Sequence, residues 1–150
     1  MQDMPLTFHV DVVSAEGAIF SGIASMLVAP TVTGEVGILA RHAPLLARLK
    51  AGVVRVTLGG VKQGEEETFF ISGGFLEVQS QSATILADTT VRTKDMDEAA
   101  ARAAVTRIEK EMGGRQLPKA EYDRLKAELN MMVMLLRSID RLPKKGKSSR

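Results

Sequence analysis

The first ninety residues contain short stretches in which apolar and polar side chains alternate or β-branched residues dominate. These stretches are residues 8–13, 53–58, 67–71, 75–79 and 83–86. Alternation with a period of two is typical of half-buried β-strands, and Gly-containing breaks at close intervals separate the stretches. No long helical period lies between them, so a parallel βαβ fold is disfavoured. The pattern predicts an antiparallel β-sandwich or barrel.

From about residue 95 the apolar period becomes that of a helix. Asp95, with Glu98 three residues later, resembles a capping box and predicts the start of a first helix there. One apolar face then follows, made of Ala101, Ala104, Val105, Ile108 and Met112. Gly113 and Gly114 predict the end of this helix, and Pro118 suits the first turn of a second one. The sequence therefore predicts an antiparallel helical hairpin after the sandwich.

The second helix carries the stronger apolar pattern. At about 100° per residue, seven apolar side chains fall within a sector of roughly 120°. They are Tyr122, Leu125, Leu129, Met132, Val133, Leu136 and Ile139. Met131, Met134 and Leu135 lie outside this sector, and a hairpin partner covers one side only. We therefore expect a second contact surface here, the alternative being a single buried core helix. Pro143 is expected to end the helix.

The net charge also differs between the predicted sandwich, the predicted hairpin and the C-terminal end of the chain. Residues 1–90 carry 5 Lys/Arg against 9 Asp/Glu (net −4), residues 91–136 carry 9 against 8 (net +1), and residues 137–150 carry 6 against 1 (net +5). This split favours two functional regions. The expected domains are a β-sandwich over 1–90, a helical hairpin over 91–143 and a basic disordered tail over 144–150.

Residues that could support catalysis are scarce. The chain has no Cys, so disulfides, zinc–thiolate sites and thiol nucleophiles are excluded. His9 and His42 are its only histidines, and neither has the spacing of a metal ligand. Glycine pairs at 59–60 and 73–74 lack the Gly-Lys-Ser/Thr signature of a phosphate-binding P-loop. We expect no catalytic, metal or cofactor site, and so a non-catalytic protein.

The sequence also argues against direct binding to membrane or nucleic acid. The N-terminus lacks a basic stretch followed by an apolar one, so no signal peptide is expected. The uncharged run at residues 18–34 is short and interrupted by Ser, Gly, Pro and Thr, and is interpreted as sheet and turns rather than as a membrane span. Membrane association is therefore expected only through a partner. The acidic sheet region and few aromatic residues disfavour a nucleic-acid-binding β-barrel.

Four segments together resemble the epsilon family of ATP synthase subunits. They are residues 8–22 (FHVDVVSAE, then IFSG), 34–46 (GEVGILARHAPLL), 71–78 (ISGGFLEV) and 85–92 (ILADTTVR). The matches follow the order and spacing of the family and cover the predicted sandwich almost end to end. The helical hairpin matches the layout of the family more loosely.

This resemblance implies a role and a location. A β-sandwich would lie beside the gamma subunit of the central stalk and rest on the membrane-embedded c-ring, turning with both as part of the rotor. The hairpin would either lie folded on the sandwich or extend into the catalytic head, where it would contact the alpha and beta subunits and restrain ATP hydrolysis. Such a protein is a peripheral subunit on the cytoplasmic face of the bacterial inner membrane, serving ATP synthesis and proton transport. The alternatives are a stand-alone nucleotide-binding sensor and a β-barrel binding module.

The resemblance also assigns contact residues. The ring-contact loop of the family falls on residues 34–42, with Glu35 and His42 as contacts and Arg41 as an addition between them. The other interpretation of this loop is a turn with a capped end. The expected inhibitory contacts of the hairpin are Met131, Met134, Leu135, Arg137 and Arg141.

Some members of the family bind ATP through a hydrophobic-Asp-x-x-Arg-Ala motif on the hairpin. Residues 96–101 here read Met-Asp-Glu-Ala-Ala-Ala. Asp97 matches the motif, but Ala100 stands where the motif has Arg. On the second helix Val133 replaces another Arg of the ATP-binding members, whereas Arg137 matches. Because phosphate binding depends on charged bidentate donors, no ATP cofactor is expected.

Overall fold

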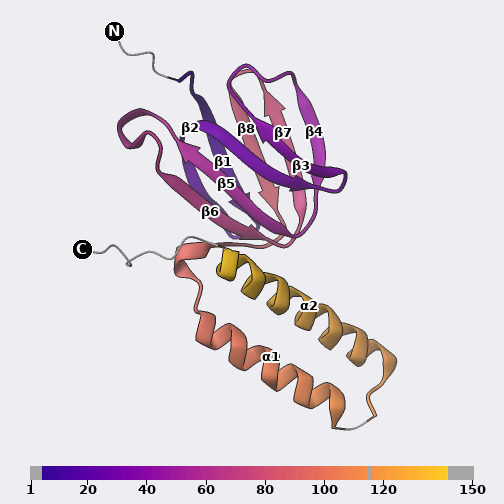
Figure 1. Cartoon of the computed structure of the whole chain (residues 1–150). Coiled ribbons are helices and arrows are strands. Elements are labelled where there is room, and N and C mark those ends of the chain that lie inside the picture. Colours follow the sequence, from indigo (N-terminus) through magenta and orange to yellow (C-terminus); the bar gives the residue numbers. More distant parts are fainter. Residues whose placement is uncertain (1–4, 115, 142–150) are drawn as a thin grey trace, which may run out of the picture. The chain divides into compact units, whose positions relative to one another are not determined.

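The computed structural model describes residues 5–114 and 116–141, with only the backbone of residues 140 and 141. The chain forms two compact units, Met1–Asp95 and Met96–Arg150 (Figure 1). The units divide five residues beyond the expected limit of 90 because one more short strand, Thr90–Arg92, pairs with the sheet.

The N-terminal unit consists of strands and two short 3-10 turns. The strands are β1 (Phe8–Ser14), β2 (Gly17–Thr31), β3 (Gly34–Ile38), β4 (Leu45–Leu49), β5 (Gly52–Leu58), β6 (Glu66–Ile71), β7 (Gly74–Gln79), β8 (Ser82–Ala87) and β9 (Thr90–Arg92). The 3-10 turns are η1 (Gly60–Lys62) and η2 (Thr93–Asp95). Each of the five predicted stretches lies within β1, β5, β6, β7 or β8, which confirms the strand pattern.

The strands form a β-sandwich, as predicted (Figure 1). One layer contains β1, β8, β7 and β4, and the other contains β3, β2, β5, β6 and β9. The 15-residue strand β2 connects them, because its first half pairs with β1 and its second half with β3 and β5. The β1–β8 pair is parallel, whereas every other pair among the described strands is antiparallel.

Alternation along the strands builds the core. In β1 every second side chain, including Val10 and Val12, is buried, and β5 buries Val54 and Val56 in the same way. Side chains from both layers meet in one cluster of buried residues, mostly Val, Leu, Ile and Ala. A core of this kind is the main source of stability of the unit, because burial of apolar area is the dominant favourable contribution to folding.

Residues 18–34 are sheet and turn, as expected: β2 continues without a break to Thr31, a turn follows at residues 32 and 33, and β3 begins at Gly34. Gly22 remains in the strand, and a Cβ atom there would lie 3.0 Å from the Phe20 ring. The aromatic ring thus occupies the space that a side chain at position 22 would fill. Aromatic cover of a strand glycine is a known way to keep a Gly-containing strand intact.

The C-terminal unit is the predicted helical hairpin, formed by α1 (Glu98–Gly113) and α2 (Lys119–Arg141) (Figure 1). Among its described residues, Ala101, Ile108 and Leu125 are the buried apolar ones. Arg107 Nη2 lies 3.4 Å from Glu128 Oε1 and links the two helices. Helix α1 ends at Gly113, as predicted. The predicted stop at Pro143 lies outside the described residues.

Both predicted helix starts are displaced in the structure. The N-cap of α1 is Asp97, whose carboxylate accepts a hydrogen bond from the Ala100 N–H at 3.0 Å. Asp95 instead lies in η2, so the predicted capping box at Asp95 is wrong by two residues. Pro118 precedes α2, where its carbonyl accepts from the Tyr122 N–H at 2.9 Å. Asp95 and Asp97 are both short polar residues that suit an N-cap, and the spacing in the sequence alone does not show which of them caps α1.

Replacement of Asp97 with Ala should loosen the first turn of α1. Loss of an N-cap of this kind costs about 1 kcal/mol of helix stability. Amide hydrogen exchange should therefore become faster at Ala100 and its neighbours, by roughly fivefold if the turn opens locally. Asp95→Ala is the matched control and should leave this exchange unchanged. Equal effects of the two substitutions would show that Asp97 is not the functional cap.

Candidate functional site

The expected ring-contact loop, residues 34–42, is a strand followed by a turn. Its first five residues form β3, which pairs with β2 and places Glu35 opposite Pro30. Ile38 is buried in the core and Val36 packs against it, so this segment is held in extended form by its inward side chains. The prediction of one continuous loop is therefore wrong. The Glu35 side chain is 62% exposed, and its Oε1 lies 3.8 Å from Arg55 Nη2 of β5.

Arg41 and His42 lie in the turn that follows β3. Arg41 has a positive φ of 66°, and its N–H donates to the Ser80 carbonyl at 2.9 Å. The His42 N–H donates to the Leu39 carbonyl at 3.2 Å, and its Nδ1 lies 2.7 Å from the Ala43 carbonyl. Since a carbonyl oxygen only accepts, Nδ1 carries the hydrogen in this contact.

The structure brings Arg41 and His42 together but does not place Glu35 beside them. Glu35 stands near the start of β3, whereas Arg41 and His42 follow its other end. A strand rises about 3.3 Å per residue, so the two parts are at least about 10 Å apart along β3. The candidate contact residues therefore form two positions, one at each end of β3.

The expected inhibitory contacts lie in the second half of α2. Met134 is 38% exposed and Arg137 is exposed, while Met131 and Leu135 are half-buried. Of the three apolar side chains expected to make these contacts, Met134 is therefore the most exposed. Arg141 is the last residue of α2, and its side chain lies outside the described residues.

The residues at and around the ATP motif are engaged in contacts within the hairpin. The Asp97 carboxylate caps α1. Among the arginines of the hairpin, Arg102 Nε lies 3.3 Å from Glu98 Oε2, and Arg107 contacts both Glu111 and Glu128. Because these guanidinium groups have carboxylate partners, they do not form a set of phosphate donors in this structure.

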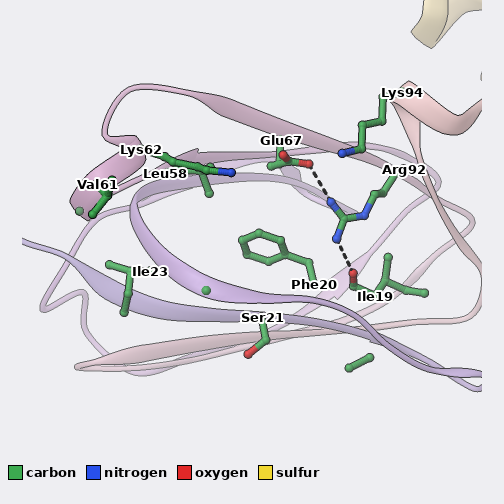
Figure 2. Close-up of a pocket in the computed structure, with 14 residues that line it drawn as sticks. Ile19, Phe20, Ser21, Ile23, Leu58, Val61, Lys62, Glu67, Arg92 and Lys94 are labelled. Atoms are coloured by element: carbon green, nitrogen blue, oxygen red, sulfur yellow. Dashed lines mark hydrogen bonds and ion pairs between the residues drawn. The ribbon is translucent and has the colours of Figure 1, made fainter.

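Sequence reasoning missed a groove beside the first half of β2, which Figure 2 shows in close-up. This β2 groove is lined by residues 18–23 and 58–62 together with Glu67, Arg92 and Lys94, and has a volume of ≈790 Å³. That volume lies within the usual range for binding clefts. Its residues come from four different segments of the sandwich, so no local spacing in the sequence could reveal it.

Arg92 is the central charged group of the β2 groove. Its Nη1 donates to Glu67 Oε1 at 3.0 Å and its Nη2 donates to the Ile19 carbonyl at 2.7 Å (Figure 2). The guanidinium also lies 5.5 Å from the centre of the Phe69 ring and 5.9 Å from that of Phe20. Hydrogen bonds and cation–π contacts of this kind fix the arginine in place. Arg92 thus connects β9 to β6 and β2.

A second polar cluster lies on the outer face of β1 and β2. His9 Nε2 is 3.1 Å from Asp11 Oδ1 and 3.0 Å from Ser21 Oγ. Both contacts use the same ring nitrogen, unlike a catalytic triad, in which the carboxylate holds Nδ1. Over residues 5–114 and 116–139, no group of three or more His, Asp or Glu side chains is arranged to hold a metal ion. Within the same part of the chain, no helix is long and apolar enough to cross a membrane.

Comparison with known proteins gives consistent matches. A family model described as "ATP synthase, Delta/Epsilon chain, beta-sandwich domain" matches residues 7–93. The ATP synthase epsilon chain of Thioalkalivibrio sulfidiphilus is 50% identical over 141 residues, which cover 93% of this chain and 96% of that one. The epsilon chain of Nitrosococcus oceani is 49% identical over 142 residues, which cover 95% and 99%.

Two solved structures share the fold at low sequence identity. A chain in the Euglena gracilis mitochondrial ATP synthase, OSCP/F1/c-ring, superposes with a TM-score of 0.74 at 19% identity, covering 92% of this chain and 84% of that one. A chain in the Tetrahymena thermophila mitochondrial ATP synthase, central stalk/c-ring, gives a TM-score of 0.57 at 18% identity, covering 91% and 99%. At this identity the two matches concern the fold alone.

Proposed function

The chain belongs to the epsilon chains of bacterial F-type ATP synthases, and we propose that it is a rotor subunit linking the gamma subunit to the c-ring. Epsilon chains are non-catalytic members of the complex. The observation that carries the proposal is the 50% identity to a bacterial epsilon chain over nearly the whole of both chains. The fold supports it, because the two similar structures are chains of ATP synthase complexes that include the c-ring.

Contact with the c-ring is assigned to the two ends of β3. Arg41 and His42 stand on a turn whose backbone is tied to Ser80 and Leu39, so their positions are defined before binding. Glu35 is exposed, and its ion pair with Arg55 is long at 3.8 Å. Exposed charges of this kind contribute more to recognition and to the rate of association than to affinity. They suit docking on a polar surface of the ring.

Restraint of ATP hydrolysis is assigned to the hairpin, through contacts with the alpha and beta subunits of the catalytic head. Met134 is the exposed apolar side chain among the candidate contacts, and Arg137 is exposed one turn later. Burial of such a methionine contributes about 1–2 kcal/mol to binding, whereas an exposed ion pair contributes about 0–1 kcal/mol. Apolar contact should therefore dominate the inhibitory docking. In this proposal the chain is peripheral, at the cytoplasmic face of the bacterial inner membrane.

Co-purification tests the rotor assignment. The full chain, carrying an affinity tag, should bring down the gamma subunit and the c-ring from mildly solubilised membranes of its own cell. The gene for the chain should also follow that of a catalytic beta subunit. Recovery of the chain without either partner would contradict the rotor function.

The alternative function, a nucleotide sensor, requires that the chain bind ATP, whereas we expect that it does not. Ala100 and Val133 occupy positions where the ATP-binding members carry Arg, and Asp97 is engaged as a helix cap. Loss of two charged phosphate donors removes roughly 3 kcal/mol or more of binding free energy. Calorimetry on the isolated chain should therefore detect no ATP binding at millimolar concentration. A micromolar dissociation constant would overturn this expectation and favour a sensor.

A further inference from the structure

Three polar side chains meet at one point on the outer face of β1 and β2. His9 and Asp11 are two residues apart on β1, so both project from the same face of the sheet. Ser21 of β2 is directly opposite Asp11 in the antiparallel pair and therefore shares that face. His9 Nε2 lies 3.1 Å from Asp11 Oδ1 and 3.0 Å from Ser21 Oγ. One nitrogen and two oxygens thus converge.

Hydrogen bonding alone satisfies this arrangement poorly. An ionised carboxylate oxygen only accepts, so His9 Nε2 carries the hydrogen in its contact with Asp11. The same nitrogen also faces the Ser21 oxygen, and one hydrogen does not point directly at two acceptors at once. A cation in the place of this hydrogen attracts the nitrogen and both oxygens together.

The distances between the three donor atoms fit a metal ion. Zn²⁺ binds imidazole nitrogen and carboxylate oxygen at about 2.0–2.2 Å. Two such ligands, at the angles of an octahedral or a tetrahedral shell, are therefore about 2.8–3.5 Å apart. Both separations from His9 Nε2, 3.1 Å and 3.0 Å, lie within this range. The imidazole and the carboxylate can bind one ion after loss of the Nε2 hydrogen, without a change of backbone.

The sheet fixes the backbone that carries the two strong ligands. β1 pairs with β2 on one side and with β8 on the other, so the backbone at His9 and Asp11 is held from both sides. The side chains of His9 and Asp11 are 44% and 35% exposed, which leaves the site open to solvent. Water can therefore fill the remaining positions around a bound ion, as it does in metal sites with few protein ligands.

The donor set selects the class of metal. Imidazole together with a carboxylate suits Zn²⁺, Ni²⁺ and Cu²⁺. Ca²⁺ takes about six to eight oxygen ligands and Mg²⁺ keeps an octahedral shell of oxygens, so one carboxylate and one hydroxyl do not hold either ion well. A site with two strong ligands, in place of the four of a structural zinc site, should bind Zn²⁺ with a dissociation constant of roughly 1–200 µM.

We propose that His9 and Asp11 bind a divalent transition-metal ion such as Zn²⁺, with Ser21 as a weaker third ligand and water in the remaining positions. The bound ion connects β1 to β2 and stabilises the folded sandwich, because it binds the folded chain in preference to the unfolded one. The sequence does not predict this site, because His9 and Asp11 form only a pair and strand pairing brings Ser21 to them. The site goes beyond the proposed rotor function and does not depend on it.

The two histidines allow the site to be located without any substitution. His9 and His42 are the only histidines of the chain, so the ring signals of both can be followed by NMR in the untagged full chain. Of the two, only His9 has a carboxylate partner among the described residues. An equimolar amount of Zn²⁺ should shift the ring signals of His9 and leave those of His42 unchanged. Equal shifts of both histidines, or no shift of His9, would overturn the inference.

Calorimetric titration with Zn²⁺ alone tests each ligand. His9→Ala should abolish saturable binding, and Asp11→Asn, which removes the charge at nearly constant size, should weaken it about tenfold. Ser21→Ala should weaken it less than about threefold, and the matched control His42→Ala should bind Zn²⁺ within about twofold of wild type. Mg²⁺ should give no saturable binding. Wild-type chain that does not bind Zn²⁺ at millimolar concentration, or binding that survives both His9→Ala and Asp11→Asn unchanged, would contradict the site.

Discussion

Removal of residues 96–150 is expected to raise ATP hydrolysis by the isolated catalytic head severalfold while the sandwich stays folded and assembled. The cut follows the division between the two compact units. It keeps η2, in which the buried Thr93 hydroxyl is hydrogen-bonded to Thr68. A cut after Arg92 would remove that contact. Hydrolysis should be measured on the head at equal occupancy of the truncated and full chains, so that lost assembly is not mistaken for lost inhibition.

A shorter truncation separates the helices from the basic end. Ending the chain at residue 143 should give a smaller rise in hydrolysis, and one that disappears as salt increases, because exposed ion pairs contribute only about 0–1 kcal/mol each and are screened. An unchanged rate after removal of the whole hairpin would contradict the inhibitory role. The hairpin would then be a structural strut.

Glu35→Lys combined with His42→Ala is expected to uncouple ATP hydrolysis from proton pumping. Reversal of an exposed charge opposes docking on the ring, and loss of the imidazole removes the contact on the turn. The fold should survive, since Glu35 loses only a long, exposed contact with Arg55. The catalytic head should detach more readily from membranes, and ATP-driven acidification should fall by more than half while hydrolysis continues.

The control for this variant is Glu77→Lys with His9→Ala, which makes the same chemical changes on the outer face of β7 and β1. Glu35 lies near the start of β3 and His42 follows its other end. Because the two residues are not in contact, the losses of coupling caused by the two single substitutions should nearly add up in the double variant. Fully coupled membranes from the Glu35/His42 variant would rule out these residues as ring contacts.

The sequence predicted the parts of the fold that repeat locally. Alternating residues such as Val54 and Val56 locate a strand and its buried face, and the helical period locates the hairpin. The direction of a strand and the identity of the strand it pairs with cannot be found from such a local pattern. Val10 is opposite Ala83 in the parallel β1–β8 pair, and either direction would bury the same side chains. Likewise Asp95 and Asp97 are equally plausible caps until the path of η2 is known.

The same limit applies to the candidate functional residues, some of which were found from the sequence and others only from the structure. Glu35, Arg41 and His42 were reached through resemblance, and only the structure shows that β3 separates the first from the other two. Arg92 and Glu67 are 25 residues apart and meet because β6 pairs with β9. An interaction that depends on long-range strand pairing is invisible to any local pattern.

The most direct test of the rotor assignment is restoration of coupling. Purified full-length chain should be added to membranes of its own cell whose ATP synthase lacks the epsilon chain, and ATP-driven proton pumping should be followed as the added amount increases. Pumping should recover and saturate near one added chain per complex, together with retention of the catalytic head on the membrane. Saturating addition with no binding and no recovery of pumping would contradict a role in linking the stalk to the ring.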